Sequence, residues 1–289
     1  MSTRIRTWVL IAGLSALLVA IGAVIGGTRG IIGFAVIAAL FNFVMFWFSD
    51  RIALKMSKAT PIPEGEQPQL REDIVELCGK AGIPVPSLHL IPNEQPNAFA
   101  TGRNPSRSAV AVTEGLLRNM PREQVKGVLA HELSHIKNRD VLVTTISAMI
   151  AASISAIANI LQFSFLFGGM GDDDESPLAM VGAIATIILA PIAAMLLQLG
   201  VSRQREYLAD ATAARLLGEG RPLAEALRTL QRGVEAVPMQ VNPATASLYI
   251  ASPLRARGMS ALFSTHPPME RRIEKLVAYD AAHGIHYAV

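Results

Sequence analysis

The chain has 289 residues, of which 51% are hydrophobic and 17% are charged, and its mean hydropathy is +0.37, which is apolar for a soluble protein. The net charge of +3 comes from basic residues beside apolar blocks, and no basic helix with interleaved aromatic residues occurs, which argues against nucleic-acid binding. The single cysteine, Cys78, excludes an internal disulfide and fits a reducing compartment.

Two apolar blocks at the start of the chain predict a membrane hairpin. No charged residue occurs in residues 7–28 or 30–49, and each block reaches the ~20 residues that a helix needs to cross a bilayer. We expect spans at about 7–27 and 30–49, with a turn at the glycine-rich residues 26–30. A cleaved signal peptide is rejected, because the second block follows at once without a convincing cleavage site. The hairpin and the basic segment after it form the first unit, residues 1–58.

The next segment, residues 59–140, predicts the first part of a domain outside the apolar blocks. Its Pro-rich start, residues 59–69, is expected to be a linker. An amphipathic helix is expected at 70–81, with Cys78 in a buried structural role on its apolar face. Short runs bounded by Pro, Asn and Gly predict a small sheet. The strands are expected at residues 87–91, 97–102 and 109–113.

The strongest chemical signal lies on a helix expected over residues 121–138. There, His131, Glu132 and His135 form an H-E-x-x-H motif. Residues four apart share one face of a helix, so both imidazoles can hold one metal ion. Glu132 lies next to a ligand and can reach a water bound to that metal. Charged residues flank the motif, which places it outside an apolar span and argues against an intramembrane protease.

A second pair of uncharged blocks predicts another membrane hairpin, residues 141–201. We expect its spans at about 142–166 and 178–200, and the alternative is a long buried helical hairpin in a soluble domain. Basic residues gather on one side of the apolar blocks and acidic residues on the other. The positive-inside rule therefore places both termini and the H-E-x-x-H motif in the cytoplasm.

The last unit, residues 202–289, offers a third ligand. Glu206 and Asp210 lie four apart on an expected helix, and a catalytic zinc needs three protein ligands and an open position for water. Glu206 can be the third ligand, and Asp210 can accept a hydrogen bond from a ligand imidazole. The alternative for Glu206 is a solvated acidic residue. His135 and Glu206 lie similar distances outside their spans, so the second hairpin would bring both to the same height above the membrane.

The rest of this unit predicts packing elements. An apolar stripe over residues 223–234 predicts a core helix, and residues 267–279 predict a terminal helix. Residues 238–260 are expected to form a loop.

Four segments carry a resemblance that covers nearly the whole chain: N-A-F-A-T-G at 97–102, H-E-L-S-H at 131–135, S-R-Q-R-E-Y-L-A-D at 202–210 and S-T-H-P-P-M-E-R-R-I at 264–273. In these segments, their order and the four-span layout, the chain resembles the HtpX-type heat-shock membrane zinc metalloproteases, gluzincins related to the CAAX prenyl proteases. The resemblance implies an α+β fold, in which a four-helix membrane anchor carries a cytoplasmic gluzincin-type domain of helices and a small mixed sheet, with one Zn²⁺ per chain.

The resemblance also implies a function. It implies an ATP-independent endopeptidase of the bacterial inner membrane, which cuts misfolded or damaged membrane proteins at their cytoplasmic side during stress. It further implies cooperation with an ATP-dependent membrane protease. The chain has no Walker-type phosphate-binding sequence, which agrees with ATP independence.

Further site residues come from the resemblance alone. It implies that His266 and Arg272 stabilise the oxyanion or anchor the substrate; taken alone, they fit a loop histidine and a charge on a solvated face. It also implies a substrate-binding edge strand, to which an extended peptide adds through main-chain hydrogen bonds. The alternative is an ordinary core strand. The residues of this strand are Asn97, Ala98, Phe99 and Ala100.

Two other functions stay open at this point. A CAAX-type processing protease has more spans around a large membrane chamber, which four spans cannot easily build. A membrane-bound zinc scaffold or pseudoprotease would bind clients without cutting them, but it has no need of a base at Glu132. Two histidines and one carboxylate around an open position favour zinc over other divalent ions.

Overall fold

The structure, a computed structural model, describes the first helix and most of the two segments predicted to form the domain, residues 59–140 and 202–289. The predicted spans at 142–166 and 178–200 lie almost wholly outside the described residues, as does His266, so the four-helix anchor stays a prediction. The described residues are 3–151, 203–237, 239, 241, 243–253 and 267–285.

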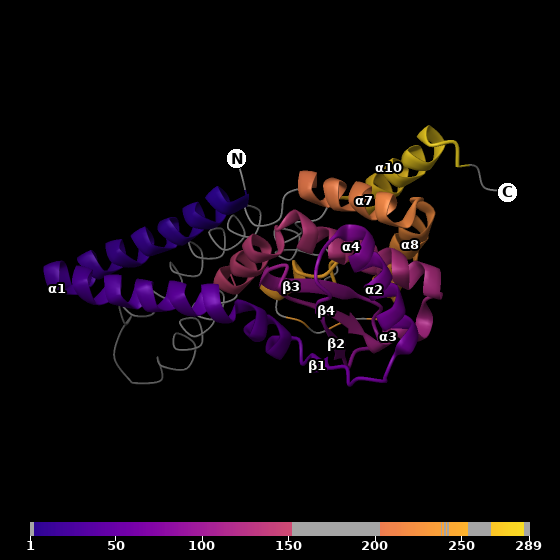
Figure 1. The fold of residues 1–289 in the computed structure, drawn as a ribbon. Coiled ribbons are helices and arrows are strands. Elements are labelled where there is room, and N and C mark those ends of the chain that lie inside the picture. The colour runs from indigo at the N-terminus through magenta and orange to yellow at the C-terminus, as the bar shows by residue number, and fades with distance from the viewer. Residues whose placement is uncertain are drawn as a thin grey trace, which may run out of the picture.

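The first helix, α1 (Thr3–Met56), reverses direction near Gly27, where φ is 53°. Glycine adopts this left-handed conformation without a steric cost. Figure 1 shows the two arms of α1 side by side, and between them the Asn42 amide donates a hydrogen bond to Ser15 Oγ over 2.7 Å. Among the described residues, Gly27–Met56 is the one helical segment long and apolar enough to cross a membrane, with a mean hydropathy of 2.3.

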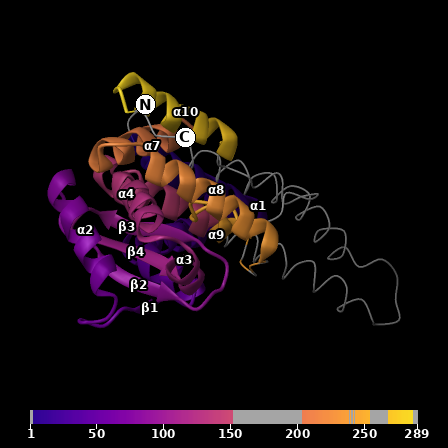
Figure 2. The same cartoon turned by 90° about the vertical axis from the view of Figure 1, so that its right-hand side faces the viewer.

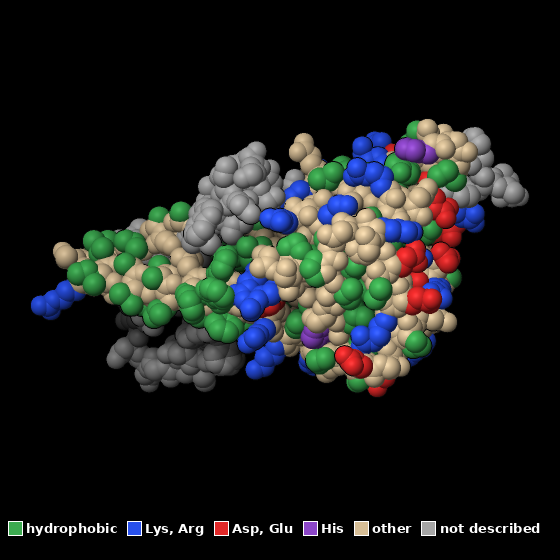
Figure 3. All heavy atoms as spheres, in the orientation of Figure 1, with side chains coloured by type: hydrophobic (Ala, Val, Ile, Leu, Met, Phe, Trp, Pro, Cys, Tyr) green, Lys and Arg blue, Asp and Glu red, His purple; other side chains and the backbone are tan. Residues whose placement is uncertain are grey.

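The outward surface of the second arm is apolar. Figure 3 shows this arm covered by hydrophobic side chains, whereas the domain beyond it carries mixed charges. A soluble helix would turn such side chains toward a core, so their exposure fits a surface that lipid covers. The exposed residues include Ile32, Val36, Leu40, Phe43 and Trp47.

A small mixed sheet forms the centre of the domain, in the strand order β1–β2–β4–β3. β2 and β4 are parallel and the other pairs are antiparallel, so the predicted mixed sheet is confirmed. β1 lies in the segment predicted as a linker; its proline is tolerated because β1 is at the edge of the sheet. The strands are β1 (Thr60–Pro61), β2 (Ser87–Ile91), β3 (Ala98–Asn104) and β4 (Arg107–Thr113).

Helices cover one face of this sheet. Figure 2 shows α4 over the sheet, with α7 and α10 stacked beyond it. α2 buries the face predicted for it, and Cys78 on that face is only 2% exposed. The helices are α2 (Pro68–Ala81), α3 (Glu114–Asn119), α4 (Arg122–Asn138), α7 (Arg203–Leu217), α8 (Arg221–Ala236), the short α9 (Pro243–Ala246) and α10 (Met269–Ala282).

The opposite face of the sheet packs on α1. Side chains alternate between the faces of a strand, so Ala98 and Ala100 join the core with α4, whereas Phe99 joins a second core. That second core contains Ala53 from α1 and Tyr249 from the segment after α9. The end of α1 is therefore part of the folded domain rather than a tether.

Close contact between α4 and α8 should make Gly127 intolerant of a side chain. A Cβ added there would lie 2.8 Å from the backbone nitrogen of Leu223, and this backbone cannot move without shifting α8. We expect Gly127→Ala to lower the free energy of unfolding by ~1–3 kcal/mol, measured by thermal unfolding in detergent. The matched control is Gly79→Ala in α2, where an added Cβ meets nothing within 4 Å and the change should be neutral or stabilising. Equal effects of the two variants would contradict the close packing.

Candidate metal centre

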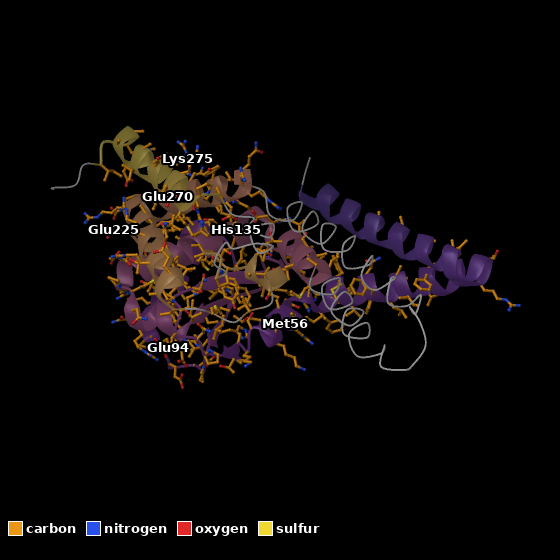
Figure 4. All side chains as sticks on the ribbon, turned by 180° about the vertical axis from the view of Figure 1, so that it is seen from behind. Met56, Glu94, His135, Glu225, Glu270 and Lys275 are labelled. Atoms are coloured by element: carbon orange, nitrogen blue, oxygen red, sulfur yellow. The ribbon has the colours of Figure 1, made fainter. Side chains whose placement is uncertain are left out.

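Helix α4 carries the H-E-x-x-H motif through the middle of the domain. In Figure 4, His135 lies over the middle of the domain, whereas Glu94 and Glu225 lie at its rim. His131 and Glu132 are 1% and 2% exposed, and His135 is partly buried. α4 packs on α2, α7, α8 and β3, so the two imidazoles are held by a helix that is itself fixed on several sides.

The two imidazoles and one carboxylate converge. His131 Nε2 lies 3.1 Å from His135 Nε2, and Glu206 Oε1 lies 3.4 Å from His135 Nε2. Glu206 Oε2 lies 3.8 Å from His131 Nε2. Ligand atoms that surround a tetrahedral zinc at ~2.1 Å are ~3.4 Å apart. The separations in this cluster therefore fit a metal ion of that size, and one atom from each of the three residues lies within 4.8 Å of the others.

The other nitrogen of each imidazole faces a carboxylate. His131 Nδ1 lies 2.9 Å from Asp210 Oδ1, and His135 Nδ1 lies 3.2 Å from both oxygens of Asp140. A proton on each Nδ1 is thereby held by a carboxylate, which leaves each Nε2 lone pair free to bind a metal. The two rings are close to perpendicular, at 89°, so their Nε2 atoms approach one point from different directions.

Asp140 reaches His135 because the chain turns sharply at the end of α4. Arg139 has a left-handed backbone with φ 58°, and its N–H and that of Asp140 bond back to the last turn of the helix. Sequence analysis missed Asp140. The closeness of Asp140 to the motif in the sequence could have suggested this contact. The turn itself was not predictable, because Arg139 stands at a left-handed position that glycine or asparagine usually takes.

Arg272 is fully buried and holds Asp210. Its Nε and Nη2 donate to the two oxygens of Asp210 over 2.9 and 2.7 Å. Arg272 is not among the described residues that line the cavity beside the ligands. The resemblance implied that Arg272 contacts the oxyanion or the substrate, and this role stays a prediction. In the structure, Arg272 Nη2 lies 3.3 Å from both ring nitrogens of His131, and its Nη1 lies 3.7 Å from Glu206 Oε2.

The pKa values of the imidazoles shift in opposite directions. Burial and the charge of Arg272 lower the pKa of His131 to about 4, so this ring is neutral at pH 7. Burial also lowers the pKa of His135, but Asp140, Glu206 and Glu132 outweigh it and raise the pKa above its ordinary value. Burial raises the pKa of Asp210 as well, yet Arg272 outweighs it and holds this pKa at about 2.

Glu132 lies beside the candidate ligands, and its pKa is raised well above the ordinary value of a carboxyl. Burial, aided by the charge of Glu206, raises its pKa to about 7 against the opposing effects of His135 and of the Ala100 N–H, which donates to it. A carboxyl with such a pKa can take up and release a proton near neutral pH. Glu132 and the three candidate ligands line one cavity, with Ala100, Val141, Thr144, Ser247, Leu248 and Ile250.

The segment predicted to bind substrate lies at the edge of the sheet. β3 is the last strand in the described sheet, and Ala100 faces the cavity. Asn97 precedes the strand, is fully buried, and directs its side chain to the backbone of Ala251. Phe99 points to the opposite face and packs in the core with Tyr249. The predicted site residues that the structure describes thus lie on α4, α7, α10 and at the start of β3, and Phe99 points away from the others into the second core.

Known proteins resemble this chain over almost its whole length. Residues 64–280 match the family described as Peptidase family M48. A "Protease HtpX homolog" of Pelotomaculum thermopropionicum is 48% identical over 277 residues, which are 95% of this chain and 98% of the relative. Proteins with the same description from Aquifex aeolicus and Pyrococcus furiosus are 49% and 48% identical, covering 91% and 94% of this chain and 88% and 94% of their own lengths.

A solved structure is also similar, the "Crystal Structure of S. mikatae Ste24p", at 21% identity and a TM-score of 0.49. The match covers 92% of this chain but only 62% of that chain. The family match and the sequence relatives confirm the resemblance that the motifs indicated. The chain belongs to peptidase family M48 and is a metalloprotease.

Proposed function

We propose that the chain is an ATP-independent zinc endopeptidase of the inner membrane, with its catalytic domain and both termini in the cytoplasm. Its substrates would be misfolded or damaged membrane proteins, cut at their cytoplasmic side. The observation that carries the proposal is the convergence of His131, His135 and Glu206, with Glu132 beside them in one cavity. Two imidazoles and a carboxylate around an open position are a donor set that suits zinc.

The residues of the chain divide the chemistry among them. Zinc, when bound by His131, His135 and Glu206, supplies a Lewis acid and lowers the pKa of a water molecule to ~7. Glu132 accepts a proton from the attacking water and delivers it to the leaving amine, for which a pKa of about 7 is well placed. Asp140 and Asp210 hold the Nδ1 protons of the imidazoles, so the Nε2 atoms stay aimed at the metal.

The position of the substrate edge supports action near a membrane. Arg103, in β3, lies with its guanidinium 4.2 Å from the ring centroid of Trp47 in α1. Tryptophan is enriched where a membrane helix leaves the hydrocarbon, and basic residues such as Arg51 follow it here. One end of β3 would then lie beside the bilayer surface, where chain segments of other membrane proteins emerge.

The first prediction separates catalysis from metal binding. We expect Glu132→Gln to keep its zinc and to cleave unfolded casein ~10²–10⁴-fold more slowly than the wild-type chain. The reason is that the glutamine amide cannot accept a proton from the attacking water. Detergent-purified protein, zinc content by elemental analysis and the rate of casein cleavage provide the measurement.

The control is Glu123→Gln, an exposed carboxylate on the same helix, which should change neither quantity. A Glu132→Gln variant that holds zinc and cuts as fast as wild type would contradict the assigned base. Zinc in both proteins with cleavage by neither would favour the scaffold alternative.

A second prediction concerns Asp140, which the sequence did not reveal. We expect Asp140→Asn to weaken zinc binding ~10–100-fold, because the amide no longer provides a carboxylate for the His135 Nδ1 proton. Competition with a chromogenic chelator measures the affinity without any activity assay. Asp50→Asn in α1 is the matched control. An unchanged affinity in Asp140→Asn would show that this contact does not position His135.

A further inference from the structure

The backbone N–H and C=O groups of successive β3 residues point alternately toward β4 and toward the outer edge of the described sheet. In an antiparallel pair, every second residue directs its N–H and C=O to the partner. The carbonyl of Asn97 accepts a hydrogen bond from Thr113 N over 3.0 Å, next to the register of β4. The backbone groups of Ala98, Ala100 and Gly102 therefore point to the free edge, where an extended substrate would pair.

At Ala98 this edge is already filled by the chain itself. Ile250 N–H donates to the carbonyl of Ala98 over 3.0 Å. The side chain of Asn97 binds both backbone groups of Ala251. Its amide N–H donates to Ala251 O over 2.8 Å, and its amide oxygen accepts from Ala251 N–H over 3.3 Å. The segment Ser247–Ala251 thus occupies the place that a substrate strand would take beside Ala98.

This segment is held firmly in place. Tyr249 is fully buried, and its ring meets that of Phe99 edge-on at 5.1 Å between centroids. Arg272 Nη1 donates to the carbonyl of Ile250 over 3.3 Å. Because Arg272 also holds Asp210 behind His131, one buried side chain positions both this segment and a predicted metal ligand.

Further along the edge, β3 borders the cavity that the predicted metal ligands line. The Ala100 N–H faces Glu132, and Ala100 lines the cavity. Leu248 and Ile250 form an apolar wall of the same cavity, together with Val141. If the scissile peptide bond of a substrate lies beside Glu132, the side chain of the substrate residue next to that bond would therefore contact Leu248.

We propose that Ser247–Ala251 is the fixed end wall of the substrate-binding edge, that a substrate strand pairs with β3 only beyond Ala98, and that Leu248 on this wall selects the side chain next to the scissile bond. The inference rests on the proposed peptidase function. The class of substrate is an extended polypeptide with a small apolar side chain at that position, because Leu248 and Ile250, which line the cavity, are apolar and bulky.

The test is a cleavage profile of a defined peptide mixture, read by mass spectrometry, with the zinc-loaded full-length chain. Leu248→Ala enlarges the cavity, so we expect the ratio of cleavage beside Phe to cleavage beside Ala to rise at least ~10-fold. Leu248→Met nearly conserves the volume and should change this ratio little. Leu54→Ala, a leucine of the same core that lies in α1, is the matched control for loosened packing and should leave the ratio unchanged.

A profile that is the same in wild type and Leu248→Ala would overturn the inference while leaving the peptidase function intact. Failure of the wild type to cut any peptide would instead reject the proposed function, and this inference with it. Should Leu248→Ala not fold, hydrogen exchange decides: in Glu132→Gln mixed with unfolded casein, the amides of 249–251 should stay protected. Loss of their protection on casein binding would show a displaceable plug and overturn the fixed wall.

Discussion

The buried ion pair between Arg272 and Asp210 is the constraint on which the site depends. A guanidinium that is fully buried is strongly unfavourable unless a carboxylate satisfies it, and Asp210 does so with both oxygens. Asp210 then has a fixed orientation for His131 Nδ1. The pair joins α10 to α7, and the contact of Asp210 with His131 adds α4. Three helices from distant parts of the chain must therefore be packed correctly before the His131 imidazole has its orientation in the site.

The sequence was most informative where chemistry and local periodicity coincide. The H-E-x-x-H spacing located His131, Glu132 and His135 because four residues on a helix make one face, and α4 has that face. Turn residues bounded β2 at Ser87–Ile91, and alternation was enough to find it. In both cases the determining contacts are within a few residues of each other, so the local sequence contains them.

What the sequence could not show depends on tertiary contact. The partnership of Arg272 with Asp210 joins residues 62 positions apart, and one of two adjacent arginines in a charged helix gives no sign of burial. Asp140 needs the left-handed turn at Arg139, which residue type does not favour. The continuation of α1 into the domain was hidden as well, because Ala53 in a basic segment becomes a core residue only when Phe99 and Tyr249 pack against it.

These contacts give the domain and its anchor a common framework. Phe99 alternates with Ala98 and Ala100 along β3. The strand therefore turns Ala98 and Ala100 toward α4 on one face, and packs Phe99 in the core with α1 on the other. Tyr249 fixes the end wall to this second core, and Arg272 fixes it to the ligand side. A shift of α1 would therefore move Phe99 and Tyr249 before it moved α4. The proposed substrate edge, rather than the predicted metal ligands, is therefore the part of the site that α1 contacts directly.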